Sequence, residues 1–169
     1  MAIDEPPVTK AGGALPATVT TSALDGPSPD GAGLIAPKVS GLPHDLWGAG
    51  LTQEIAERLV THPNDDLPAL RQLFLTLLLA EVDAPVDAGG KGELLQVRID
   101  KLLALGALEQ AAALIEAAGT PSPELFRRAF DVALLTGAED RACQFMANEP
   151  HLAPTLPARI FCLARSGDW

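Results

Sequence analysis

Apolar residues recur every three to four positions along most of the chain after residue 51, which is the spacing of one face of an α-helix. Glycine or proline separates most of these segments, as expected where helices end. The pattern predicts helices over residues 52–62, 67–82, 93–105, 108–118, 123–136, 139–149 and 155–166. Because Leu and Ala dominate these segments and β-branched residues are few, the composition also predicts an all-α fold.

The segment 67–82 is apolar on nearly every side. Its apolar residues at helical spacing are Leu70, Leu73, Phe74, Leu77 and Leu78, and Leu75 and Leu79 widen the stripe. A helix that lies on the surface normally has one apolar stripe only. We therefore expect this helix to be central and covered on more than one side.

Residues 1–40 keep neither a helical nor a strand period for more than a few positions. Pro, Ala, Gly and Thr are abundant there, and such a segment buries too little apolar area to offset the entropy of ordering it. We predict a disordered arm, either a tether or a tail without a role, followed by a helical domain over residues 41–169. Trp47 lies in a loop of that domain and is expected to dock on the first helices, with contact to a partner protein as the alternative.

The net charge of −10 argues against nucleic acid or an anionic membrane as a partner, since phosphate groups would be repelled. The longest apolar run, residues 73–80, is too short to span a bilayer, so no membrane insertion is expected. Residues 1–7 lack the basic start and apolar stretch of a signal peptide. The sequence does not assign a cellular compartment. If the true start of the protein lies upstream and carries an export signal, the location would be periplasmic.

The sequence shows no catalytic constellation, and we predict no catalytic, cofactor-binding or metal-binding residue. There is no GxSxG, HExxH or phosphate-loop motif. His44 stands beside Asp45 but no nucleophile accompanies them, and His62 and His151 are too far away in the sequence to match a ligand spacing. The chain is therefore not expected to be an enzyme by itself.

Cys143 and Cys162 are too few for a disulfide scaffold or a four-thiolate zinc site. Free cysteine is commonly buried, so we interpret them as two buried thiols. The alternative is a disulfide or redox pair between neighbouring helices, which would matter in an oxidising compartment.

Glycines recur at a regular interval in the second half of the chain. Gly106, Gly137 and Gly167 are 31 and 30 residues apart. Small residues and prolines stand at matching distances after the first two glycines: Ala111 and Ala142 at five, Pro123 and Pro154 at seventeen, and Ala118 at twelve after Gly106. Glycine permits the positive φ that closes a helix, alanine lets helices approach closely, and proline ends one helix and starts the next.

From residue 93 onward this pattern resembles the tetratricopeptide (TPR) family of helical repeats, although the interval is shorter than that family's 34 residues. The resemblance implies stacked antiparallel hairpins, a TPR-like α-solenoid. Within it, SGDW (166–169) is the turn between paired helices and Trp169 begins the second one. The final helix would then lack its partner and expose apolar surface, so we expect an N-terminal fragment of a longer protein, truncated at residue 169.

A second resemblance concerns the phrases SGLPHDLWG, RIDKLLALGALEQA, ELFRRAFDVALLTG and PARIFCLARSGDW. They are similar to uncharacterised bacterial proteins sometimes labelled antifreeze-glycopeptide-related. We attribute that label to Ala/Thr/Pro-rich stretches such as residues 11–24. Ice binding needs a flat, regular threonine array, which this stretch does not offer, so ice binding is not expected.

These observations favour a non-enzymatic scaffold that binds another protein or a peptide on the concave surface of stacked hairpins. The alternative is a helical support domain of a larger cell-envelope enzyme whose catalytic part is missing from this chain. A catalytic motif beyond Trp169 would decide in favour of the alternative.

Overall fold

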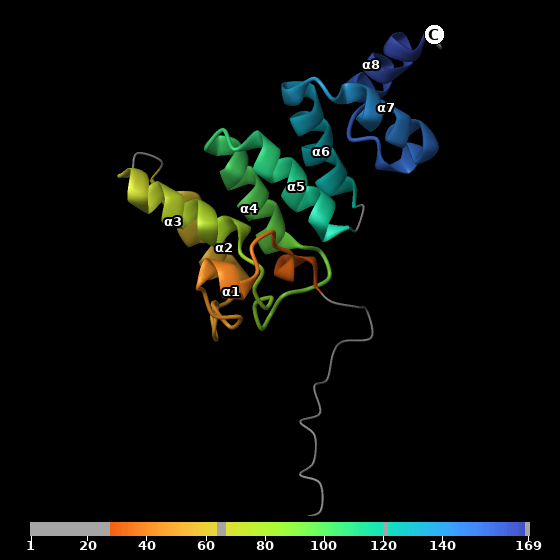
Figure 1. Ribbon diagram of the computed structural model, residues 1–169. Helices are drawn as coiled ribbons and strands as arrows, with labels where there is room; N and C mark the ends of the chain where they lie inside the picture. Colours follow the sequence, from red (N-terminus) through yellow and green to blue (C-terminus); the bar gives the residue numbers. More distant parts are fainter. Residues whose placement is uncertain (1–27, 64–66, 120–121, 168–169) are drawn as a thin grey trace, which may run out of the picture.

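A computed structural model describes residues 28–63, 67–119 and 122–167 (Figure 1). Over these residues the chain is helical and contains no named strand, which confirms the all-α class. The helices are η1 (Pro29–Gly31), α1 (Pro37–Ser40), α2 (Thr52–Thr61), α3 (Pro68–Leu79), α4 (Glu93–Ala104), α5 (Leu108–Ala118), α6 (Pro123–Thr136), α7 (Glu139–Asn148), η2 (Pro150–Leu152) and α8 (Leu156–Ser166). Each helix predicted after residue 51 is present with closely similar bounds.

From α4 onward, each α-helix packs against the next α-helix along the chain (Figure 1). In addition α4 packs against α6. In the predicted hairpins α4–α5 and α6–α7, α4 and α6 are the first helices, so the first helices of successive hairpins are neighbours. The helix α4 also contacts α2 and α3 and provides the fully buried Leu94, Leu95, Ile99 and Leu102 of the main apolar cluster. A second cluster joins α6, α7 and α8 through residues that include Phe126, Met146 and Cys162.

Local chemistry explains where the repeat helices begin and end. Gly106 and Gly137 follow α4 and α6 with φ of 73° and 74°, a left-handed conformation that residues with a side chain rarely adopt. Ser122 caps the start of α6, because its Oγ accepts a 3.2 Å hydrogen bond from the N–H of Leu125. Thr155 caps α8 in the same way through the N–H of Ala158.

The prediction that the whole of residues 1–40 is a disordered arm was wrong for residues 28–40, which fold against the helices; residues 1–27 lie outside the described part. The N–H groups of Leu34 and Ile35 donate to the carbonyl of Leu79 at 2.8 and 3.1 Å, and the N–H of Glu81 donates to Ile35. This pairing satisfies backbone groups of a segment with no helical period. Such long-range partners leave no periodic signal in the sequence.

The prediction that α3 is central was also wrong. Its side chains Leu70 and Leu73 are exposed, as is Leu67 just before it, and only Leu78 and Leu79 at its end are buried. The central place belongs to α4, which contacts α2, α3, α5 and α6. The apolar residues around a helix indicate how much of its surface could be buried. The elements that pack against the helix determine how much of that surface is buried.

A carboxylate from a distant loop caps the start of α2. Asp87 Oδ1 accepts hydrogen bonds from both the backbone N–H and the Oγ1 of Thr52, each at 2.8 Å. The backbone bond, followed by the hydroxyl bond, holds the pKa of Asp87 below its ordinary value of 3.8. The loop before α4 is therefore tied to the N-terminus of α2.

We predict that Asp87→Ala lowers the midpoint of thermal unfolding by a few degrees, whereas Asp87→Asn keeps an acceptor oxygen and has a smaller effect. Since the folded-state pKa is depressed, the contribution of the ionised cap is complete above about pH 4 and is lost as pH falls through the folded value. Circular-dichroism melts from about pH 2 to pH 7 check this. Equal pH dependence of the wild type and Asp87→Asn would contradict it.

Candidate interaction surfaces

The repeat residues occupy corresponding places in the helices. Gly106, Gly137 and Gly167 follow α4, α6 and α8, each with a positive φ, and α5 and α7 begin two residues after the first two. Ala111 is fully buried, and Ala118 and Ala142 are half-buried. Pro123 is the first residue of α6 as expected, but Pro154 does not start α8, which begins after the cap at Thr155.

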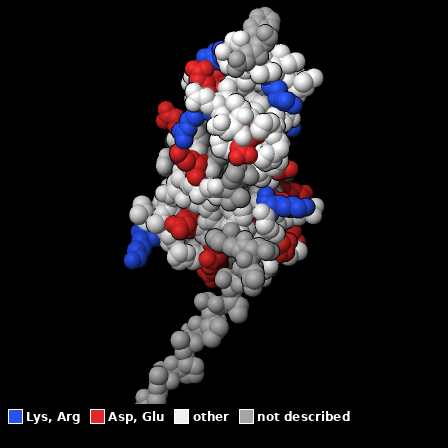
Figure 2. Space-filling view, turned by 90° about the vertical axis from the view of Figure 1, so that its right-hand side faces the viewer, with Lys and Arg blue, Asp and Glu red and all other residues white. Residues whose placement is uncertain are grey.

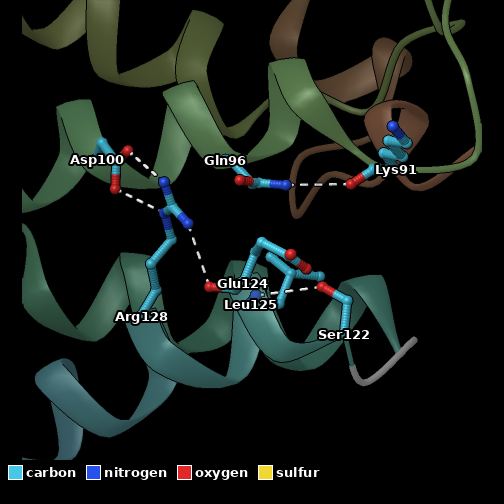
Figure 3. Close-up of polar contacts among 7 residues, drawn as sticks. All are labelled: Lys91, Gln96, Asp100, Ser122, Glu124, Leu125 and Arg128. Carbon is cyan, nitrogen blue, oxygen red and sulfur yellow. Dashed lines mark hydrogen bonds and ion pairs between the residues drawn. The ribbon is translucent and has the colours of Figure 1, made fainter. Parts of the chain in front are cut away.

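The α4–α6 face is the surface where these two first helices lie side by side (Figure 3). The guanidinium of Arg128 on α6 donates to both carboxylate oxygens of Asp100 on α4, at 2.7 and 2.6 Å, and to the carbonyl of Glu124 at 3.1 Å. On the same face Gln96 donates to the carbonyl of Lys91 at 3.1 Å. This bidentate ion pair between Arg128 and Asp100 fixes α4 and α6 relative to one another at the surface.

Along α4 and α6, positions at equal distances from the terminal glycines carry residue types in the same order. Counting back from Gly106 and Gly137, the equivalent rows are Gln96, Asp100 and Leu103 on α4, and Arg127, Asp131 and Leu134 on α6. Both rows read polar, acidic, leucine. Asp100, Arg127, Asp131 and Leu134 are exposed, and Gln96 and Leu103 are half-buried. The α4–α6 face therefore repeats its chemistry from one helix to the next.

The α8 face is the second candidate surface and is formed by Leu156, Ile160 and Leu163. These residues are four and three positions apart, so they share one side of α8. Their exposed fractions are 67, 56 and 45%. By contrast, Ala158 and Cys162 point to the second apolar cluster and are buried. Three large exposed apolar side chains in one row make this face a candidate contact surface.

The helix α8 is attached to α7 by covalent and ionic contacts. Cys143 on α7 and Cys162 on α8 form a disulfide with Cα atoms 5.2 Å apart, so the alternative of a bond, and not two buried thiols, is what the structure shows. Arg165 on α8 lies 2.5 Å from Asp140 and 3.0 Å from Glu139. The hydrogen bond from Arg165 holds the pKa of Asp140 below its usual value. A shallow groove of about 460 Å³ runs along this contact.

Charge is mixed on the side of the molecule shown in Figure 2, where acidic and basic side chains are interspersed. Within the described residues, no three His, Cys, Asp or Glu side chains lie close enough to hold a metal ion. In the same part of the chain, no helix has the length and apolar character needed to cross a bilayer.

Sequence reasoning missed the buried charges of α4. The Arg98 side chain is fully buried and donates to the carbonyls of Leu78, Asp30, Ala32 and Ala80 at 2.8, 3.2, 2.7 and 2.9 Å. Lys101 donates to the carbonyls of Val60 and His62, where α2 ends. A signal was available, because both cations stand on the apolar side of α4 beside Leu94 and Leu102. Both are structural residues and hold segments onto α4.

Trp47 packs, half-buried, against the main apolar cluster, as expected of a docked loop residue. Its indole N–H is buried and has no hydrogen-bond acceptor among the described residues. The predicted role of Trp169 as the start of a further helix falls outside the described residues. Trp47 therefore contributes to the core and is not counted among the candidate surfaces.

Comparison of the chain with protein-family models, with curated proteins and with solved structures gave no match. The fold and its surfaces define an all-α protein with serially packed helices. The TPR-like resemblance remains a prediction.

Proposed function

We propose that this protein is a non-enzymatic helical-repeat scaffold that binds another protein or a peptide, and that it is the N-terminal part of a longer protein. The observation that carries the proposal is the α4–α6 face, where equivalent residues follow the same order on two neighbouring helices. A repeated surface of this kind grows with each added helix pair, which is how solenoid proteins build extended binding surfaces.

Rigidity and mixed chemistry suit this face for binding. Asp100 and Arg128 hold the two helices in register, so little ordering is required when a partner arrives. Leu134 offers exposed apolar area, while Arg127 and Asp131 offer opposite charges one helical turn apart. A partner would fit with apolar residues over the leucines and charges of both signs over Arg127 and Asp131.

The test is co-precipitation from the source cells with the wild type and two double variants. We expect Arg127→Glu/Leu134→Asp to recover at least about ten-fold less of a protein that the wild type recovers. The matched control makes the same kinds of change on exposed positions of α2, Arg58→Glu/Val60→Asp, and should recover it fully. Circular dichroism establishes that all three are folded. Equal recovery by both variants, or no specific protein with the wild type, would refute the proposal.

A further inference from the structure

The α8 face occupies positions that are covered in the two preceding first helices. Counting back from the terminal glycines, Leu156, Ile160 and Leu163 correspond to Leu95, Ile99 and Leu102 of α4 and to Phe126, Phe130 and Ala133 of α6. The α4 residues are all 0% exposed, and the α6 residues are 6, 4 and 8% exposed. Only in α8 does this row face solvent among the three helices.

The covering element is known for α4 and α6. Ala111 and Leu114 of α5 are fully buried in the same cluster as the α4 row, and Met146 of α7 is buried in the cluster that contains Phe126 and Phe130. In both pairs the cover is the helix that follows the terminal glycine. The row in α8 has the side-chain types of α4, Leu-Ile-Leu, and therefore matches the surface that α5 covers.

We propose, building on the scaffold function, that the α8 face is covered by an amphipathic helix of α5-like chemistry that follows the Gly167 turn in the same polypeptide and runs antiparallel to α8. It carries a small residue five positions after Gly167 and a leucine eight positions after it, as Ala111 and Leu114 follow Gly106. The small residue permits close approach of the two helices, and the leucine fills the space between the apolar side chains of α8.

The turn favours a helix in the same chain over a separate molecule. Gly167 has φ of 82°, close to the 73° and 74° of the glycines after which α5 and α7 begin. A helix that began two residues after Gly167, as α5 and α7 do after Gly106 and Gly137, would meet α8 without the entropy cost of bringing two molecules together. Three side chains on an 11-residue helix also bury far less than the roughly 1,000 Å² that a stable interface between separate proteins needs.

The test uses the full chain with a copy of residues 107–119 grafted directly after Gly167 in place of residues 168–169. We expect hydrogen exchange of the α8 amides, followed by mass spectrometry, to slow by at least about ten-fold relative to the ungrafted chain. Sedimentation should show a monomer. This measurement reports on α8 alone. A graft that fails to protect α8 would leave the proposed binding at the α4–α6 face untouched. Loss of partner binding at the α4–α6 face would likewise leave the proposed cover of α8 untouched.

Two matched variants complete the experiment. A graft in which the copied Ala111 and Leu114 are both replaced by aspartate should leave α8 exchange at the ungrafted rate. Ile160→Asp in the first graft should remove the protection, because it places a charge in the contact. Equal slowing by both grafts, no slowing by the first, or slowing only at concentrations where the chain dimerises would overturn the proposal.

Discussion

Replacing Arg98 with methionine is expected to lower the free energy of unfolding by about 3–5 kcal/mol. The guanidinium is fully buried and donates to four carbonyls, which come from the segment before α1 and from the end of α3. Methionine fills similar volume but leaves these acceptors without a donor. It also leaves the carboxylate of Asp30, which is 1% exposed, without a nearby positive charge.

Urea unfolding followed by circular dichroism measures this loss, and Arg127→Met is the matched control. Arg127 is exposed on the next first helix, so its replacement should change the free energy of unfolding by less than about 0.5 kcal/mol. The double variant Asp30→Asn/Arg98→Met should be more stable than Arg98→Met, because no uncompensated carboxylate then remains buried. An Arg98→Met protein within about 1 kcal/mol of the wild type would show that the four hydrogen bonds contribute little.

The charge state of this network supports the size of the effect. Burial lowers the pKa of Arg98 to about 10, and the nearby Asp30 opposes that change. Arg98 therefore still carries its proton at neutral pH. Burial raises the pKa of Asp30, against the 2.7 Å hydrogen bond from the N–H of Leu95 and the charge of Arg98. Arg98 on α4 is tolerated in the interior through its contacts with the segment that contains Asp30. Asp30 is tolerated through its contacts with Leu95 and Arg98 of α4.

The helices could be predicted because their signals are local. Spacing of apolar residues located α4 to α8, and Gly106 and Gly137 marked ends that depend on one residue's backbone freedom. The exposed apolar surface expected on the last helix is present as the α8 face. Its residues Leu156, Ile160 and Leu163 are the repeat equivalents of residues that are buried in α4 and α6.

What could not be predicted depends on contacts between distant residues. Asp30 accepts a hydrogen bond from Leu95, 65 positions away, and this contact orders a segment whose composition predicts disorder. Similarly, α3 is as apolar as a central helix, but α4 takes that place. Its Arg98 and Lys101 side chains reach the backbone of three other segments: the segment before α1, the end of α3 and the end of α2. Periodicity reports the amphipathic face of a helix and leaves its neighbours undetermined.

Reduction of the disulfide between Cys143 and Cys162 is expected to release α8 from the body of the protein. Among the described residues of α8, only Ala158 and Cys162 are buried, and an isolated helix of 11 residues is marginal in water. Closing the loop between cysteines 19 positions apart stabilises the attached state by about 3 kcal/mol in the chain-entropy view. The exposed contacts of Arg165 contribute little in comparison.

Hydrogen exchange with and without a dithiol reductant measures the effect. The dithiol is oxidised to its own disulfide, and the two cysteine sulfurs each gain a proton. Amides of residues 156–166 should then exchange about 100-fold faster, as 3 kcal/mol implies, while those of α4 stay unchanged. Cys143→Ser/Cys162→Ser should reproduce the fast exchange without reductant. Unchanged protection of α8 in the reduced protein would mean that its few buried contacts suffice, and the disulfide would then be incidental to the position of the α8 face.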